Sequence, residues 1–369
     1  MTNTKIITLT LTENCNLNCV YCYEHNKTKR NMDIATAKKI ISEELLANDG
    51  MNEVYFSFFG GEPFLAFDLI KELHSYIIEQ AKATKKKVYC TSTTNGTLIH
   101  GEIKDWLTKN ADTFKCGLSY DGTDTLQNIN RSNSANKIDL HFFKSVWADS
   151  SIKMTISPKT IEHFADGVIF LHNNGYDVAC NLAYGMNWED YDFHKAYENQ
   201  LFKLVNYYLE HPTIKPCNML DKAIFIIDGE IPTTIRKWCG SGTNMKTYDI
   251  HGNCYPCQYF MPISMEGDDQ KISFKDKRFE TEIPVEAFSS KCQSCKLLKA
   301  CPTCMGANYT ETGNLYHKDD KYCDYIKLEF LATSYLKWEQ IKRDQLKVDD
   351  NTKYRLLQGI KVVQEELVK

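Results

Sequence analysis

The chain has 369 residues, 43% of them hydrophobic, and a formal net charge of −4. This is the composition of an ordinary globular protein with room for more than one hydrophobic core, and its charge gives no reason to expect nucleic acid or an anionic membrane as a partner. No apolar run approaches the roughly 20 residues that span a bilayer, and the first residues lack a secretory signal, so we expect a cytoplasmic protein.

From the start to about residue 212, strand-like and helix-like segments alternate. The expected strands are Ile6–Thr12, Val54–Phe59, Val88–Thr93, Cys116–Ser119, Lys153–Ser157 and Val178–Leu182. The expected helices are Ile34–Ala47, Phe67–Lys82, Glu102–Thr108, His141–Ala148, Glu162–Asn173 and Tyr191–Leu209. Six strand–helix units in series predict an α/β fold with a parallel sheet, built as an open or partial (β/α)6 barrel over residues 1–212.

The remainder of the chain has a different character. Residues 213–238 read as a bridging region, and residues 239–323 are rich in cysteine, glycine and tyrosine with little long periodicity. A small region with so little regular core is expected to need metal to hold it together. Residues 324–369 read as two C-terminal helices.

Cysteine is unusually frequent. The chain has 15 cysteines, clustered toward both ends, and an odd number without a secretory signal argues against a disulfide scaffold. In a reducing compartment, such clusters are better explained as metal ligands.

The first cluster is "CNLNCVYC", with Cys15, Cys19 and Cys22 spaced C-x3-C-x2-C directly after the first expected strand. Three thiolates can hold three irons of a 4Fe–4S cluster and leave the fourth iron open. An open iron can bind the amino and carboxylate groups of S-adenosylmethionine. This motif, "GGEP" after the second strand and the six-unit barrel pattern together resemble the radical SAM superfamily.

The resemblance implies S-adenosylmethionine as cosubstrate and a set of residues that bind it. Tyr21 corresponds to an aromatic residue near the adenine, and the turn of Gly60, Gly61 and Glu62 to the group that receives the methionyl ammonium. The other implied contacts are Ser119 and Asp121 at the ribose, Arg131 at the methionyl carboxylate and Leu182 at the adenine. The alternatives are solvated surface for Ser119 and Arg131, core packing for Leu182, and a plain turn role for the nearby Asn95.

The later cysteines read C239-x12-G252-x4-C257, C292-x2-C295-x5-C301-x2-C304 and C323. This resembles the SPASM extension of radical SAM enzymes, with one departure, because the last spacing is x2 where the family has x3. The resemblance implies two auxiliary 4Fe–4S clusters, and hence three clusters in all. The first would use Cys239, Cys257 and Cys304, and the second Cys292, Cys295, Cys301 and Cys323.

Two points stay open at this stage. Cys254 is either a fourth ligand of the first auxiliary cluster or a free thiol beside it. Zinc is the rival metal, although zinc ribbons usually place 12–20 residues between their cysteine pairs and only five separate Cys295 from Cys301.

The resemblance implies an enzyme that reductively cleaves S-adenosylmethionine to a 5′-deoxyadenosyl radical and abstracts a hydrogen from a precursor peptide or protein. We expect a ribosomal peptide maturase that installs a thioether or carbon–carbon cross-link. The first alternative is an anaerobic sulfatase-maturing enzyme, which is disfavoured because Gln258 stands where those enzymes have an aspartate base. The second is a non-catalytic iron–sulfur or zinc protein, which needs neither "GGEP" nor Arg131.

Several partners are also expected. An electron donor such as flavodoxin or ferredoxin would reduce the cluster. The barrel starts within a dozen residues of Met1, so leader binding is expected to use a separate protein, the C-terminal helices or another mode. The sequence assigns no catalytic base and no radical-quenching residue.

Overall fold

The computed structural model describes residues 3–188, 193–265 and 273–368, and the chain forms two compact units. The first unit comprises Met1–Tyr120, Arg131–Ser151 and Cys239–Glu280, and the second Asp121–Asn130, Ile152–Trp238 and Thr281–Lys369. The predicted domain boundaries at residues 212, 238 and 323 stay predictions.

The sheet of the first unit contains strands from both ends of the chain. Its order is β4-β3-β2-β1-β8-β9. The bounds are β1 Thr4–Thr12, β2 Glu53–Gly60, β3 Lys87–Thr94, β4 Phe114–Ser119, β8 Met245–Tyr248 and β9 Cys254–Tyr255. Strands β1 to β4 and β8 run parallel, with Ile6 opposite Met245, and β9 is antiparallel to β8. The beginning of the cysteine-rich region therefore extends the N-terminal sheet.

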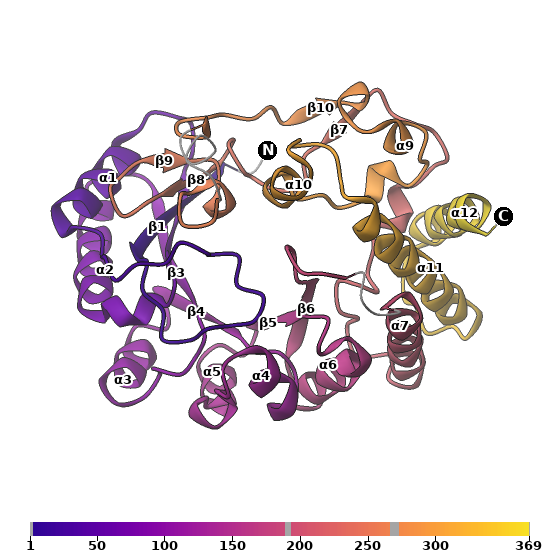
Figure 1. Ribbon diagram of the computed structural model, residues 1–369, viewed down its shortest axis with the longest axis horizontal. Coiled ribbons are helices and arrows are strands. Elements are labelled where there is room, and N and C mark those ends of the chain that lie inside the picture. Colours follow the sequence, from indigo (N-terminus) through magenta and orange to yellow (C-terminus); the bar gives the residue numbers. More distant parts are fainter. Residues whose placement is uncertain (1–2, 189–192, 266–272, 369) are drawn as a thin grey trace. The chain divides into compact units, whose positions relative to one another are not determined.

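Helices of the first unit cover the outer side of this sheet (Figure 1). They are α1 Ile34–Leu46, α2 Phe67–Lys82, α3 Gly101–Lys109 and α5 Leu140–Val146, and the short 3-10 turn η1 Pro63–Ala66 precedes α2. Helix α1 begins after Asp33, whose side chain accepts a hydrogen bond from the backbone N–H of Thr36. In α2, Ile70, Leu73 and Ile77 are fully buried at helical spacing.

The second unit contains the remaining elements. Its strands are β5 Ser151–Ile156, β6 Asp177–Leu182, β7 Thr234–Arg236 and β10 Glu282–Pro284, with β5 beside β6 and β7 antiparallel to β10. Its helices are α4 Asp124–Asn130, α6 Phe164–Asn173, α7 Phe193–Glu210, α9 Ser290–Gln293, α10 Met305–Thr312, α11 Asp320–Lys342 and α12 Asp350–Leu367. Helix α11 packs against both α7 and α12 (Figure 1).

The six expected strands and six expected helices are present, so the predicted α/β class with mostly parallel strands is confirmed. Tyr191, the predicted start of the sixth helix, lies outside the described residues. The first C-terminal helix begins at Asp320, four residues earlier than predicted, because Asp319 caps it through the N–H of Lys321. Cys323 therefore lies in the first turn of α11.

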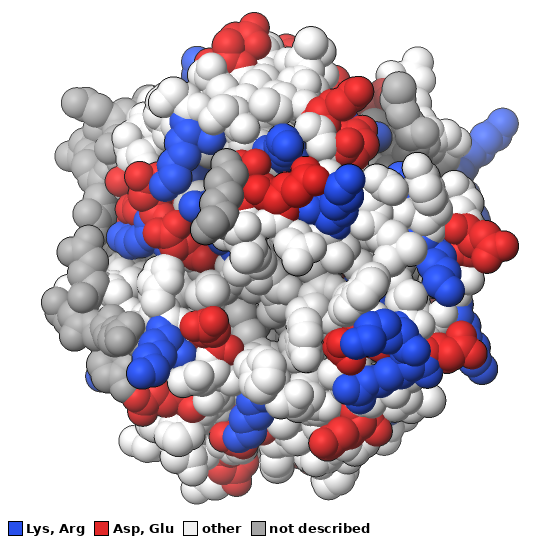
Figure 2. Space-filling model, turned by 90° about the vertical axis from the view of Figure 1, so that its right-hand side faces the viewer, with Lys and Arg blue, Asp and Glu red and all other residues white. Residues whose placement is uncertain are grey.

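The molecular surface carries charges of both signs. On the face shown in Figure 2, Lys and Arg side chains of the described residues are interspersed with Asp and Glu. Several pairs are in contact in the second unit, such as Lys299 with Asp228 at 2.6 Å. None of the described helices has the length and apolar character required to cross a bilayer.

Candidate active site

The N-terminal cysteine loop follows directly on β1. The N–H of Cys22 donates to the carbonyl of Cys19 at 3.2 Å, and the three cysteines of the loop are half-buried. Lys27 approaches with its Nζ 2.9 Å from Cys22 Sγ. Burial raises the pKa of the Cys15 thiol, and the charge of Lys27 opposes that rise. Three thiols on one loop beside an ammonium group suit a metal cluster that binds thiolates.

The two glycines at the end of β2 press against this loop. A Cβ atom on Gly60 would lie 2.2 Å from the carbonyl oxygen of Thr12, and one on Gly61 would lie 2.4 Å from that of Asn14. Gly60 has a φ of 152°, a conformation that other residues rarely adopt. Backbone hydrogen bonds from Gly61 to Thr12 and from Glu62 to Asn14 fix the approach. Only glycine permits this close contact between turn and cysteine loop.

Glu62 is buried at the floor of the site, with 1% of its surface exposed. Its Oε1 accepts hydrogen bonds from the N–H of Phe64 and the hydroxyl of Thr94, and its Oε2 accepts one from the N–H of Asn95. Burial nevertheless raises the pKa of Glu62 to about 7. An ionised carboxylate has about four acceptor positions, so these three donors leave one position for a cationic group such as the methionyl ammonium.

Asn95 has a supporting role that the sequence did not reveal. The backbone N–H of Asn95 donates to Glu62, and its side chain makes further hydrogen bonds. Nδ2 donates to Asn16 Oδ1 at 2.9 Å, and Oδ1 accepts from the N–H of Thr97 at 3.0 Å. Asn16 in turn donates to the hydroxyl of Thr97 at 2.8 Å. The end of β3 is thereby tied to the cysteine loop. The only signal for this in the sequence is the polar "TTNGT" after the strand.

Two more predicted residues lie together beside the loop. The guanidinium carbon of Arg131 is 5.3 Å from the ring centroid of Tyr21, a cation–π contact. Arg131 is buried, and its charge lowers the pKa of Glu62 against the larger effect of burial. The structure therefore brings Tyr21, Glu62 and Arg131 together with the cysteines. Ser119 ends β4 in the same unit.

Asp121 and Leu182 belong to the second unit. Asp121 is fully buried, and its Oδ1 accepts from the N–H of Thr155 while its Oδ2 accepts from Asn130. These bonds hold α4 against β5 and are sufficient to explain why an aspartate is buried at this position. Leu182 is half-buried at the end of β6. Roles for Ser119, Asp121 and Leu182 in binding a cosubstrate stay predictions.

The segment that follows Cys257 is fastened to the N-terminal cysteine loop. The rings of Tyr23 and Tyr259 stack with their centroids 4.4 Å apart. Asn26 adds three hydrogen bonds to backbone carbonyls of residues 262, 263 and 265, at 2.8 to 3.0 Å. The pKa of Tyr23 is raised by burial and further by the negative charges of Glu24, Tyr259, Cys22 and Cys257 when those groups are ionised.

The cysteines predicted to bind the auxiliary clusters differ in their exposure and in their neighbours. In the first unit, Cys239 is exposed and Cys254 is half-buried on β9. In the second unit, burial raises the pKa of Cys295 to about 11, and Cys301 and Cys323 beside it add to the rise. Lys318 places its Nζ 3.2 Å from Cys301 Sγ. The predicted ligand sets of the auxiliary clusters, Cys292 and Cys304 included, stay predictions.

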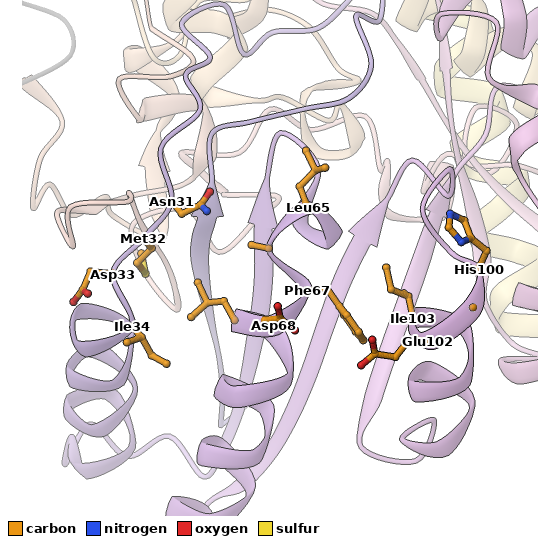
Figure 3. Close-up of a pocket in the computed structure, with 13 residues that line it drawn as sticks. Asn31, Met32, Asp33, Ile34, Leu65, Phe67, Asp68, His100, Glu102 and Ile103 are labelled. Carbon is orange, nitrogen blue, oxygen red and sulfur yellow. The ribbon is translucent and has the colours of Figure 1, made fainter.

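A separate groove of about 700 Å³ lies on the first unit at the N-terminal ends of α1, α2 and α3 (Figure 3). Its walls are apolar at Ile34, Phe67 and Ile103, and acidic residues such as Asp68 stand among them. Of the described residues that line it, none is a predicted site residue.

Comparison with known proteins agrees with this geometry. Residues 9–198 match the Radical SAM superfamily. A cysteine-type anaerobic sulfatase-maturating enzyme of Clostridium perfringens is 26% identical over 361 residues, covering 87% of this chain and 91% of that enzyme. The radical SAM cyclopropyl synthase TigE of Paramaledivibacter caminithermalis is 23% identical over 364 residues, covering 88% of this chain and 72% of that protein.

Two further similarities differ in extent. An uncharacterized protein of Methanocaldococcus jannaschii is 39% identical over 118 residues, but the match spans only 32% of this chain and 39% of that protein. The structure described as native anSMEcpe with bound AdoMet and Cp18Cys peptide superposes with a TM-score of 0.68 at 18% identity, covering 92% of this chain and 99% of that one. The family match spans more than half of the residues and includes the cysteine loop, the glycine turn, Glu62 and Arg131, so this chain belongs to the Radical SAM superfamily and is an enzyme of that superfamily.

Proposed function

We propose that this protein is a peptide-modifying radical SAM enzyme that installs an intramolecular thioether or carbon–carbon cross-link in a precursor peptide. When bound, the 4Fe–4S cluster and S-adenosylmethionine supply a 5′-deoxyadenosyl radical. Cys15, Cys19 and Cys22 would hold the cluster. Glu62 and Arg131 would hold the ammonium and the carboxylate of the cosubstrate.

The observation that carries the proposal is the fastening of the 257–265 segment to the cysteine loop. The Tyr23–Tyr259 stack and the three bonds of Asn26 attach the segment that begins at Cys257 to the loop that carries Cys22. A cross-link between a carbon and a thiol removes two hydrogen atoms from the peptide, so a redox-active group beside the radical centre suits this reaction. We assign that role to the first auxiliary cluster, with the predicted ligands Cys239, Cys257 and Cys304.

The nature of the relatives supports a peptide or protein substrate. One solved structure with the same fold contains a bound peptide together with AdoMet. In this proposal an external donor such as flavodoxin or ferredoxin reduces the cluster.

Formylglycine formation on a sulfatase is the second candidate. It is favoured by the similarity to the Clostridium perfringens maturase, which extends over most of both chains. Against it stands Gln258, the residue directly after Cys257, because an amide side chain cannot act as a base near neutral pH.

The two candidates give different products. The reconstituted, reduced protein would be incubated anaerobically with S-adenosylmethionine and either a candidate precursor peptide or a sulfatase peptide that contains the target cysteine. We expect 5′-deoxyadenosine, and a precursor peptide that has lost two hydrogen atoms and shows cross-linked fragments by mass spectrometry. Conversion of the sulfatase cysteine to an aldehyde, with the precursor unchanged, would establish the second candidate instead.

A further inference from the structure

Cys254 and Cys257 form a C-x2-C pair, "CYPC", of the kind that often contributes two ligands to one metal centre. Whether both cysteines serve one cluster depends on the direction in which each side chain points. The first unit provides the answer, because Cys254 lies on β9, whose register with β8 and β1 is defined.

The strand register places Cys254 on the side of the sheet that faces α1. Cys254 is directly opposite Tyr248 on β8, and Tyr248 is level with Leu9 on β1. Residues two apart on a strand share a face, so Leu9 shares its face with Lys5. The Lys5 ammonium lies 2.8 Å from Glu44 Oε2 on helix α1, which identifies this face as the helix-covered one.

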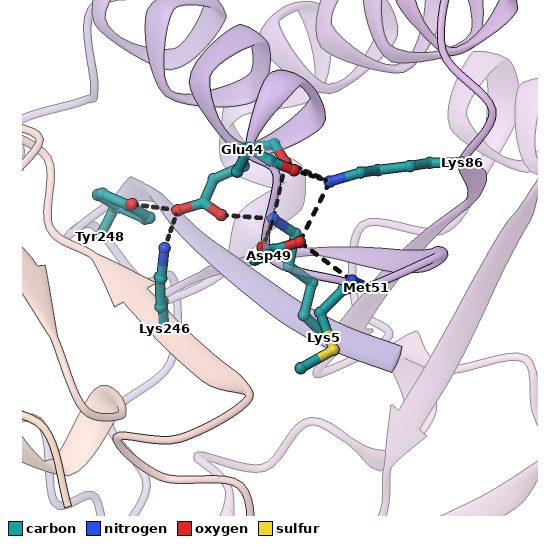
Figure 4. Close-up of polar contacts among 8 residues, drawn as sticks. Lys5, Glu44, Asp49, Met51, Lys86, Lys246 and Tyr248 are labelled. Carbon is teal, nitrogen blue, oxygen red and sulfur yellow. Dashed lines mark hydrogen bonds and ion pairs between the residues drawn. The ribbon is translucent and has the colours of Figure 1, made fainter. Parts of the chain in front are cut away.

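Cys254 lies opposite Tyr248, which belongs to a polar network on that face together with Glu44, Lys5 and Lys246 (Figure 4). The hydroxyl of Tyr248 donates to Glu44 Oε1 at 2.6 Å. Lys246, two residues before Tyr248, reaches the same oxygen at 2.5 Å. The network therefore clamps β8 and β9 onto α1, and Cys254 lies at its edge.

The segment after Cys257 lies on the opposite face. Thr10, which alternates with Leu9, donates its hydroxyl to the sulfur of Met261 at 3.2 Å. Met261 follows Cys257 by four residues, in the segment that Tyr259 and Asn26 fasten to the cysteine loop. The sheet therefore separates the Cys254 side chain from the segment that follows Cys257.

We infer that Cys254 is not a cluster ligand but a positioning residue of the Glu44 network, and that Cys257 alone of this pair binds the first auxiliary cluster. This inference rests on the auxiliary clusters of the proposed function. It leaves three predicted cysteines, Cys239, Cys257 and Cys304, for the four irons of that cluster.

Substitution at the two positions separates the roles. Anaerobically reconstituted wild type should hold about 12 iron atoms per chain if three 4Fe–4S clusters are present. We expect C257S to lose about four of these irons, with the matching loss of signal in electron paramagnetic resonance after reduction. We expect C254S to retain the wild-type iron content and spectrum, because serine preserves a hydrogen-bonding group opposite Tyr248.

The variant C254A separates a loss of stability from a loss of a cluster ligand, because alanine removes the hydrogen-bonding group that serine keeps. A lower melting temperature in C254A, with full iron content in C254S, supports the network role. Equal loss of iron from C254S and C257S would overturn the inference. An unchanged iron content in C257S, with wild type at about four irons per chain, would instead overturn the auxiliary clusters of the proposed function.

Discussion

Replacing Glu44 by Gln tests how firmly helix α1 is attached to strand β1. Lys5 and Glu44 form an ion pair at 2.8 Å in which both side chains are only 4% exposed. Removing one partner of a buried pair costs about 3–5 kcal/mol. Asp49, 2.7 Å from Lys5 and one-third exposed, still offsets part of the loss. We therefore expect a cost near the lower limit, about 3 kcal/mol.

Hydrogen exchange followed by mass spectrometry measures this cost locally. A loss of about 3 kcal/mol predicts roughly 100-fold faster exchange of the protected amides in β1 and α1, if they open together. Lys38 provides a matched control, since it lies on the same helix as Glu44 and pairs with Glu72 of α2 at 2.6 Å, but these two side chains are 34% and 54% exposed. K38Q should change exchange by a few-fold at most, because exposed pairs contribute about 0–1 kcal/mol. Equal effects of E44Q and K38Q would refute the reasoning.

Acid should weaken the same contact. Burial alone would raise the pKa of Glu44, but hydrogen bonds from Lys246, Lys5 and Tyr248 outweigh it and lower the pKa. A carboxyl group with a lowered folded-state pKa stabilises the fold above its unfolded-state value, and this contribution disappears as the pH falls through the lowered value. The difference in stability between wild type and E44Q should therefore have its full size at pH 7 and should shrink below about pH 4.

Three further changes address the active site. G61A should lose the N-terminal cluster, because its Cβ would collide with the backbone of Asn14. The loss would be measured as about four fewer irons per chain and no release of 5′-deoxyadenosine. The control G117A, whose Cβ would make only ordinary contacts, the nearest at 3.7 Å, should keep the cluster and the activity. E62Q should weaken S-adenosylmethionine binding about 10- to 100-fold in equilibrium dialysis of the reconstituted protein, through loss of a charged hydrogen bond; unchanged affinity would exclude the ammonium contact. Chelation of iron should accelerate hydrogen exchange around Cys295, and exchange equal to that of the loaded protein would contradict a structural role for metal there.

Much of the N-terminal fold could be predicted because its signals are local. The helical spacing of Ile70, Leu73 and Ile77 and the capping residue Asp33 both act within a few residues. The cysteine loop and the glycine turn were likewise recognisable as short motifs. Their juxtaposition follows from parallel strands, whose carboxyl ends meet at one edge of the sheet.

The features that could not be predicted depend on contacts between distant residues. Strand β8 has four residues and pairs with β1 from about 240 positions away, so no local pattern announces it. Lys27 and Asn95 look like ordinary surface and turn residues until the fold brings them to Cys22 and Glu62. The direction of Cys254 likewise depends on a register that sequence spacing does not contain.

The late arrival of β8 has a consequence for synthesis in the cell. Until the ribosome has made Met245, β1 has one edge without the strand that covers it in the native sheet. An uncovered strand edge is a template for aggregation. A fragment that ends before this residue should therefore associate with itself.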